Sequence, residues 1–426
     1  MHEIGVLPLH GVVQHYDWGG YDFIPGLVGI ANSDRKPFAE LWMSAHPKAP
    51  ATADVAGIAM PLDRVIAEAP DRILGPSASA RFGGHLPYLF KVLDVASMLS
   101  IQAHPTKKQA AAGFARENAA GIDLGAADRN YKDENHKPEM AVALTDFWML
   151  HGFRPLDQIA EALRKVPELR SIMPDFSVRL ARAGDATQAH RDLLRDLYCA
   201  VMTMPQERVD LLLNALVERL ATVAPSDHDG PDYWAVRAVE TFPAVGGHRD
   251  RGIFSIYLLN LVHLRPGQGT FQPAGTLHAY LEGVTVELMA NSDNVLRGGL
   301  TQKHVDVPEL LRILSFDSGT PQVLDGEPAA GPDRVYGTPS DDFELSRIDL
   351  AASGHYLGQA AYGPDSIIVL EGGATLTARG QSIPLARGAI VFVPFGTHYS
   401  LNARVTPAML FKASVPGQAD SVPGSE

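Results

Sequence analysis

The segment PAGTLHAY (residues 273–280) has a weak counterpart in PFGTHYSL (residues 394–401), and this internal repeat decides the fold that the sequence predicts. Each copy follows a strand-like stretch that starts at a glycine, Gly267 in the first and Gly388 in the second. Two β-barrel domains of one type would produce such a repeat, and short strands at regular spacing favour a jelly roll. A chance likeness between two turn sequences is the alternative explanation.

A helical pattern interrupts the β-rich chain. Between about residues 154 and 225, apolar residues recur every three or four positions in three segments, as they do on one face of a helix. On both sides of this block, short stretches of apolar residues are separated by Gly and Pro, as in short strands joined by turns. Strand character is predicted to return at Phe254–Leu264, and a further helix is predicted from Val305 to Leu314. The sequence thus predicts a mainly β protein with a helical insert.

The charge balance of the chain limits its partners. The 426 residues include 36 Lys and Arg against 49 Asp and Glu, so the formal net charge is −13. Nucleic acid is bound by a surplus of basic side chains, and we therefore expect no nucleic-acid partner. A small anionic substrate would need a local basic site that works against the overall field. The apolar content of 46% excludes a disordered chain.

Cysteine and hydropathy patterns predict the compartment. Cys199 is the single cysteine of the sequence, so no intramolecular disulfide can form, and a reducing compartment is expected. The first twenty residues show no basic segment leading into an apolar one, and no apolar run approaches the roughly 20 residues of a membrane helix. We expect a cytoplasmic protein without a membrane partner.

Polar residues with metal-binding chemistry occur in three separate segments. Gln102 and His104 are two apart in SIQAHP, so a strand would point both to one face. Glu139 follows Lys137 in NHKPEM, and His278 lies in the PAGTLHAY turn. Taken singly, each of these residues also fits a structural or solvent-facing role. Together they supply two imidazoles, a carboxylate and an amide oxygen, a set suited to zinc with an open position.

A fourth polar segment, NSDNVLRGGLTQK (residues 291–303), contains Arg297 and Lys303. Its glycines and small polar residues could order a loop in which an arginine binds an anion with both arms of the guanidinium. Surface loops often have the same composition, so this pattern alone is not specific.

Five motifs, taken together, resemble the type I phosphomannose isomerases in the order of that family and over nearly the whole chain. They are YDWGG (16–20), LPYLFKVLDVASMLSIQAHP (86–105), NHKPEMAVAL (135–144), PAGTLHAYLEG (273–283) and VELMANSDNVLRGGLTQKHVD (286–306). Gln302 stands where a proline is common, and Thr285 interrupts the GVTVELM strand. Neither departure touches an expected ligand.

The resemblance implies a zinc-dependent aldose–ketose isomerase that interconverts mannose 6-phosphate and fructose 6-phosphate through an enediol. It implies a catalytic cupin barrel at residues 1–152 and 251–317, an inserted helical domain at 153–250, and a second cupin barrel without metal at 318–426. One Zn²⁺ per chain would be bound by the residues matching the family's ligands, Gln102, His104, Glu139 and His278. A monomer acting on a small phosphosugar is expected.

Roles for further residues follow from the chemistry that the resemblance implies. Arg297, which matches the family's active-site arginine, would stabilise the enediolate or bind the phosphate. Lys137, beside Glu139 and near a metal's positive charge, is hypothesised to shuttle protons. Lys91, Ser100 and Lys303 are weaker candidates for the phosphate, and a structural role is an equal alternative for each. Trp18 and Tyr280 are candidates for the cavity wall, although an aromatic residue next to a glycine turn more often serves packing alone.

The second copy of the repeat provides an internal control. It contains His398 but no Gln-x-His strand and no Lys-Pro-Glu counterpart before it, so His398 is predicted to be structural. Two rival functions remain: another metal-dependent cupin enzyme, such as a dioxygenase or epimerase, and a non-catalytic sugar-binding bicupin. Gln102 argues against the first, because those enzymes usually present a His-x-His strand. The retention of four ligands together with Arg297 argues against the second.

Overall fold

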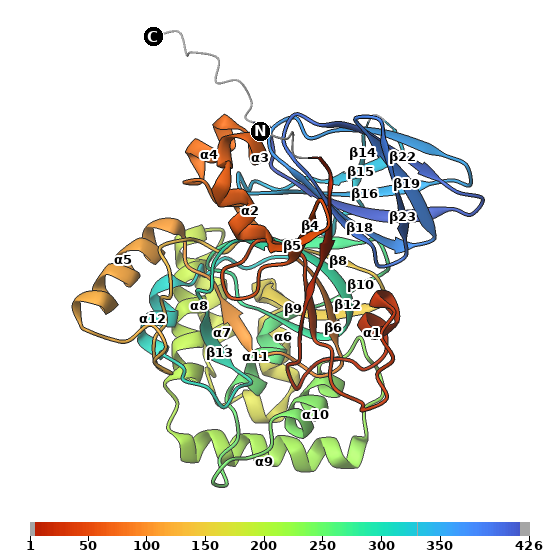
Figure 1. Ribbon diagram of the computed structural model, residues 1–426. Helices are drawn as coiled ribbons and strands as arrows, with labels where there is room; N and C mark the ends of the chain where they lie inside the picture. The colour runs from red at the N-terminus through yellow and green to blue at the C-terminus, as the bar shows by residue number, and fades with distance from the viewer. Residues whose placement is uncertain (1–4, 330, 418–426) are drawn as a thin grey trace.

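The computed structural model, which describes residues 5–329 and 331–417, contains three antiparallel sheets (Figure 1). Helices accompany the sheets, so the prediction of a mainly β protein with helices is confirmed. The outermost residues of the expected domains, 1–4 and 418–426, lie outside the described residues.

A ten-stranded sheet carries the expected site residues. Its strands are β2 (Val12–Gln14), β3 (Glu40–Trp42), β6 (Tyr88–Val95), β7 (Ile101–Ala103), β8 (Glu139–Ala143), β9 (Phe147–Phe153), β10 (Leu259–Leu264), β11 (Gly269–Gln272), β12 (His278–Ala290) and β13 (Leu296–Gly299). The main path runs β10-β9-β12-β6-β3-β2, while β11 pairs with β8 and β13 pairs with β7. Strand β12 pairs with β6, β7, β8 and β9, so it connects the segments that contain the predicted ligands.

The two remaining sheets contain the C-terminal strands. The nine-stranded sheet, in the order β14-β15-β16-β23-β18-β21-β1-β4-β5, consists of β1 (Leu7–His10), β4 (Thr52–Val55), β5 (Ile58–Pro61), β14 (Glu327–Pro328), β15 (Asp333–Tyr336), β16 (Glu344–Leu350), β18 (Asp365–Glu371), β21 (Ile390–Val393) and β23 (Ala408–Ser414). The four-stranded sheet, in the order β17-β22-β19-β20, consists of β17 (His355–Gln359), β19 (Gly373–Ala378), β20 (Gln381–Ala386) and β22 (His398–Ala403).

The first strand of the chain lies among the last ones. Strand β1 pairs with β21, with Leu7 opposite Phe392 and Leu9 opposite Ile390. Leu7 and Leu9 are buried in a core that also takes in Val286 of β12, so apolar side chains of both halves of the chain hold this pairing. Boundaries at 152 and 318 therefore do not separate the sheets, since β1, β4 and β5 extend the sheet of the C-terminal strands.

The helical periodicity after residue 154 is confirmed. The helices are α6 (Leu156–Lys165), η1 (Pro167–Leu169), α7 (Phe176–Ala183), α8 (Thr187–Met202), α9 (Gln206–Val223) and α10 (Pro231–Thr241). They gather at one end of the molecule, in the lower part of Figure 1. The periodic leucines Leu194 and Leu197 of α8 and Leu213 and Leu216 of α9 are buried in one core.

Helix α12 (Val307–Ile313) confirms the helix predicted from Val305 to Leu314, and the Asp306 carboxylate caps it by accepting a hydrogen bond from the Glu309 N–H at 3.0 Å. The strand predicted from Phe254 is wrong in its first half, because α11 (Gly252–Leu258) precedes β10. All seven residues of α11 are buried, and a continuous apolar run does not distinguish a buried helix from a buried strand.

The expectation of strands and turns over the first 150 residues is also wrong in part. Five helices lie there, α1 (Phe23–Val28), α2 (Leu62–Glu68), α3 (Pro70–Ile73), α4 (Pro76–Arg81) and α5 (Lys107–Ala119). Helix α5 begins with a capping box, in which the Thr106 hydroxyl accepts from the Gln109 N–H and the Gln109 side chain accepts from the Thr106 N–H. The sequence Thr-x-x-Gln before an alanine-rich run is the signal that would have identified it.

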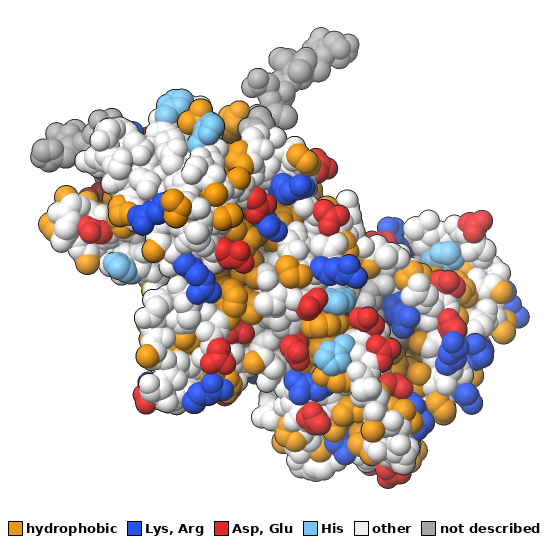
Figure 2. Space-filling model, turned by 90° about the vertical axis from the view of Figure 1, so that its right-hand side faces the viewer, with side chains coloured by type: hydrophobic (Ala, Val, Ile, Leu, Met, Phe, Trp, Pro, Cys, Tyr) orange, Lys and Arg blue, Asp and Glu red, His pale blue; other side chains and the backbone are white. Residues whose placement is uncertain are grey.

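No helix among residues 5–329 and 331–417 is both long and apolar enough to cross a bilayer. On the face shown in Figure 2, acidic and basic side chains are mixed. The net negative charge is therefore spread over that face rather than gathered in one patch.

Candidate metal centre

Three buried side chains from three strands converge in the ten-stranded sheet. His104 directly follows β7, Glu139 begins β8, and His278 begins β12. One ligand atom from each lies within 4.8 Å of the other two, and all three residues are at most 2% exposed. His104 Nε2 lies 3.3 Å from Glu139 Oε1, and His278 Nε2 lies 3.2 Å from Glu139 Oε2. Within the part of the chain that the structure describes, no other such group of three is found.

Backbone carbonyls fix the orientation of both imidazoles. His104 Nδ1 donates to the Asn294 carbonyl at 2.8 Å, and His278 Nδ1 donates to the Thr276 carbonyl at 3.0 Å. Each Nε2 then carries a lone pair, is buried, and has no hydrogen-bond partner. Burial, together with the nearby charge of Lys137, lowers the pKa of His104 to about 4, so this imidazole is neutral near pH 7. Metal-binding histidines require this arrangement.

Glu139 is ionised despite its burial. Burial by itself would raise the pKa of this carboxyl, but Lys137 and His104 outweigh it and hold the pKa well below its usual range. Lys137 Nζ lies 3.3 Å from Glu139 Oε1. The centre therefore presents an anionic carboxylate between the Nε2 atoms of the two imidazoles.

Gln102 lies beside this group. In β7 it is opposite His278 of β12 and also opposite Arg297 of β13. Directly opposed residues of antiparallel strands project to the same face, so the three side chains form a row across the sheet. With the amide oxygen of Gln102, the donors present fit zinc: two imidazole nitrogens, a carboxylate oxygen and a neutral oxygen.

A cavity of about 750 Å³ opens over this centre. Among the expected site residues, the cavity is lined by Trp18, Lys91, Gln102, Lys137, Glu139, Tyr280, Arg297 and Lys303. His104 and His278 are buried beneath it. Ser100, expected to contact a phosphate, is not among the described residues that line the cavity, although Leu99 and Gln102 are.

A buried charge network lines one wall of the cavity. Lys91 of β6 pairs with Glu287 of β12 and lies 3.8 Å from Glu40, and the Tyr280 hydroxyl donates to Glu287 at 2.7 Å. Burial alone would lower the pKa of Lys91, but Glu287 and Glu40 outweigh it and raise this pKa, so the ammonium stays charged. Sequence reasoning missed Glu40 and Glu287. Acidic residues within the apolar stretches FAELWM and VTVELMA were the signal.

Cations also line the cavity. Arg297 is partly desolvated, and burial lowers its pKa. Burial, followed by the charges of Arg297 and Lys132, lowers the pKa of Lys303 as well. Lys132, which sequence reasoning did not single out, also lines the cavity. Arg297, Lys303 and Lys132 together form the local basic site that a small anion would need in an acidic protein.

Aromatic rings border the same opening. The Tyr16 and Trp18 rings stack with centroids 5.9 Å apart, and both residues line the cavity. Tyr280 is buried, and its hydroxyl is committed to Glu287. The chemistry available is therefore a metal centre, a buried lysine with its carboxylates, and an anion-binding side, all within one cavity.

Comparison with known proteins identifies the family. Residues 6–156 match the sequence model of the type I phosphomannose isomerase catalytic domain. The mannose-6-phosphate isomerase of Escherichia coli is 38% identical over 383 residues, which cover 89% of this chain and 93% of that protein. The chain belongs to the type I phosphomannose isomerase family. The human mannose-6-phosphate isomerase is 34% identical over 419 residues, covering 94% of this chain and 96% of that protein.

Solved structures of phosphomannose isomerases share the fold. The Salmonella typhimurium mannose 6-phosphate isomerase bound to fructose 6-phosphate and zinc superimposes with a TM-score of 0.84 at 34% identity, over 97% of this chain and all of that one. A zinc-bound mannose 6-phosphate isomerase gives a TM-score of 0.84 at 35% identity, with the same coverage.

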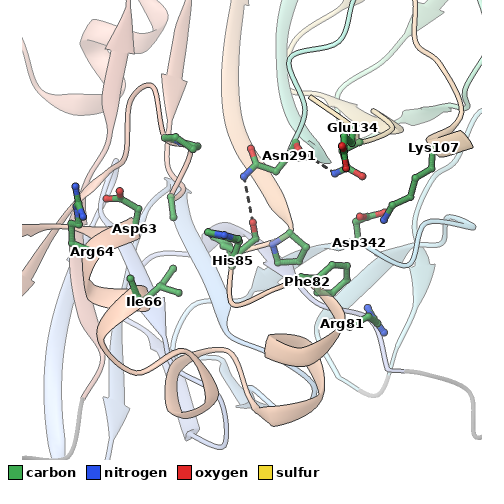
Figure 3. A pocket seen from close by; sticks show the side chains of 16 residues that line it. Asp63, Arg64, Ile66, Arg81, Phe82, His85, Lys107, Glu134, Asn291 and Asp342 are labelled. Atoms are coloured by element: carbon green, nitrogen blue, oxygen red, sulfur yellow. Dashed lines mark hydrogen bonds between the residues drawn. The ribbon is translucent and has the colours of Figure 1, made fainter. Parts of the chain in front are cut away.

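The protein has a second cavity, of about 820 Å³, beside α2 and α4 (Figure 3). Its lining mixes cations such as Arg81 and Lys107 with acids such as Glu134 and Asp342. The side-chain amide of Asn291 donates to the Leu86 carbonyl at 3.5 Å and helps to form its wall. None of the three converging residues His104, Glu139 and His278 lines this cavity.

The C-terminal copy of the repeat shows no comparable centre among the described residues. His398 is the first residue of β22 and is exposed, and no metal-binding group includes it within the described residues. That observation agrees with a structural role for His398, which stays a prediction.

Proposed function

We propose that this chain is a zinc-dependent isomerase that interconverts D-mannose 6-phosphate and D-fructose 6-phosphate through an enediol. The observation that carries the proposal is the convergence of His104, Glu139 and His278 beneath a cavity that also holds Arg297 and Lys303. The relatives named mannose-6-phosphate isomerase, and the neighbouring structure with fructose 6-phosphate and zinc, support the same reaction.

Four residues are assigned to the metal: Gln102, His104, Glu139 and His278. When bound there, zinc supplies a Lewis acid that polarises the sugar oxygens and favours charge on them in the transition state. The carbonyls that accept from His104 Nδ1 and His278 Nδ1 hold both rings in the ligating tautomer. This orientation is what makes the site a preorganised one.

The isomerisation requires a proton to leave carbon 2 of the aldose while the carbonyl oxygen gains one, and then a proton to reach carbon 1 while the oxygen on carbon 2 loses one. We assign the shuttle to Lys137, because its Nζ lines the cavity 3.3 Å from the ligating carboxylate. The network of Lys91, Glu287 and Tyr280 lies across the cavity and is suited to hold sugar hydroxyls.

Arg297 and Lys303 are assigned to the anionic end of the reaction. A partly buried guanidinium binds phosphate or an enediolate oxygen with both arms, and the adjacent Lys303 and Lys132 favour the phosphate. We further infer two cupin barrels, the second without metal, in a monomeric protein of a reducing compartment such as the cytoplasm. The single cysteine of the sequence supports this last inference.

The test is a coupled assay that follows formation of fructose 6-phosphate from mannose 6-phosphate by the zinc-loaded protein. Turnover is expected with zinc and should be lost in protein stripped by a chelator. Arg297→Lys provides the matched variant, since it keeps the charge but loses the two-armed geometry, and its turnover should fall while bound zinc stays constant. Absence of turnover with one zinc per chain would refute the isomerase and leave a sugar-binding protein.

A further inference from the structure

Gln272, the last residue of β11, has a fully buried side chain without a polar partner. It is 0% exposed, and neither its Nε2 nor its Oε1 makes a hydrogen bond. Buried amides are nearly always satisfied in folded proteins, so an unpartnered one needs an explanation, such as a functional role or a bound ion or water nearby. No motif and no step of the proposed reaction accounts for this residue.

The strand register places Gln272 next to the metal centre. In the pairing of β11 with β8, Gln272 is directly opposite Glu139. Opposed residues in antiparallel strands share a face and have Cβ atoms about 5 Å apart. Glu139 Oε2 is likewise buried and makes no hydrogen bond, although His278 Nε2 lies 3.2 Å from it. A buried donor and a buried acceptor thus face each other across adjacent strands.

The backbone on either side of Gln272 is fixed to the same centre. His151 lies opposite His278 in the pairing of β9 with β12, and its Nε2 donates to the Phe271 carbonyl at 3.1 Å. The Gly275 N–H donates to the His104 carbonyl at 2.8 Å. Gln272 is absent from the described lining of the substrate cavity, so it approaches Glu139 from the protein side rather than from the substrate side.

We propose that Gln272 is a positioning residue of the metal centre: in the zinc-loaded protein its side-chain NH₂ donates to the Glu139 carboxylate and holds it in the ligating orientation. The proposal rests on the proposed function only in that His104, Glu139 and His278 bind zinc. Groups that orient metal ligands typically change metal affinity by 10- to 100-fold when they are removed.

The experiment compares Gln272→Met with Thr270→Val in the full chain. Thr270 lies on the same strand, is buried, and donates to the Gln322 carbonyl at 3.1 Å, away from the metal ligands. Zinc affinity is measured by competition with a chromophoric chelator, and urea unfolding is measured on the metal-free proteins. Gln272→Met should weaken zinc binding 10- to 100-fold, and its metal-free form should unfold at the same or a higher urea concentration, because an unpartnered amide has been removed. Thr270→Val should unfold earlier and bind zinc as the unmodified protein does.

Three results would overturn the proposal. If Gln272→Met binds zinc within twofold of the unmodified protein, Gln272 does not contact Glu139 in the zinc-loaded state. If Thr270→Val weakens zinc binding equally, the effect comes from disturbing β11 in general and not from the Gln272 amide. If the absorption spectrum of Co²⁺-loaded Gln272→Met indicated a coordination number different from that in the unmodified protein, Gln272 would itself be a metal ligand. Gln272→Leu replaces the methionine variant if that does not fold. Unmodified protein that binds zinc without isomerase turnover would refute the proposed function but not this contact.

Discussion

Replacing Lys91 by methionine would leave two acids of a buried network without their cation. The side chains of Lys91, Glu287 and Glu40 are only 7%, 3% and 10% exposed. Removing one partner of a buried ion pair typically costs about 3–5 kcal/mol, because the other charge stays buried without compensation. We therefore expect Lys91→Met to lower the free energy of unfolding by about 3–5 kcal/mol at pH 8.

The double variant Lys91→Met/Glu287→Gln separates this electrostatic loss from a role in binding. The glutamine oxygen still accepts from the Tyr280 hydroxyl, and no charge remains at that position. The double variant should therefore recover most of the lost stability while its isomerase activity stays low. Urea unfolding followed by circular dichroism, on metal-free and zinc-loaded protein, measures the first quantity, and the coupled assay measures the second.

The pH dependence gives an independent check on the sign. Burial raises the pKa of Glu287 in the folded protein even with Lys91 present. Without Lys91, the folded state holds this proton more tightly than the unfolded state does, so the stability that Lys91→Met loses relative to the unmodified protein should be smallest at low pH and grow as pH rises. A loss below about 1 kcal/mol in Lys91→Met, or a double variant no more stable than the single one, would refute the reasoning.

Three further outcomes follow from the structure. Glu139→Ala removes the anionic oxygen between His104 and His278, so bound zinc, measured by elemental analysis, and turnover should both be lost; retention of both contradicts its assignment as a ligand. Arg297→Ala should keep one zinc per chain and lose turnover, whereas loss of the metal would make Arg297 structural. Burial raises the pKa of Asp365 to about 6 in the folded protein, against an ordinary value of 3.8, so native Asp365 costs stability as pH rises. The stability of Asp365→Asn relative to the unmodified protein should therefore grow by up to about 3 kcal/mol between pH 4 and pH 8, and a flat difference in urea unfolding would contradict it.

Periodicity and local motifs predicted the parts of the fold that depend on nearby residues. The leucine pattern of α8 and α9 identified these helices because each has one buried face. Helix α5 was missed because its alanine-rich sequence has little amphipathic character, so only its capping box marks it. The run from Phe254 to the end of α11 resembled a strand because its residues are mostly apolar and all of them are buried.

Residue chemistry pointed to the candidate metal group more directly than to the rest of the cavity. His104, Glu139 and His278 were identified from their types and motifs, but their convergence depends on β12 pairing with both β7 and β8, which no local pattern encodes. Gln272 had no distinguishing sequence signal at all. Its significance appears only in the register that sets it opposite Glu139.

The pairing of β1 with β21 has a consequence for how the protein is made. Residues 7–10 leave the ribosome some 380 residues before their partners at 390–393, so the N-terminal strand must wait with an unpaired edge during most of synthesis. Contacts between such distant segments slow folding, and the waiting edge is open to pairing with other chains. A fragment that ends before residue 318 would lack that partner strand permanently, so the metal-binding half is not expected to be separable as an independent enzyme.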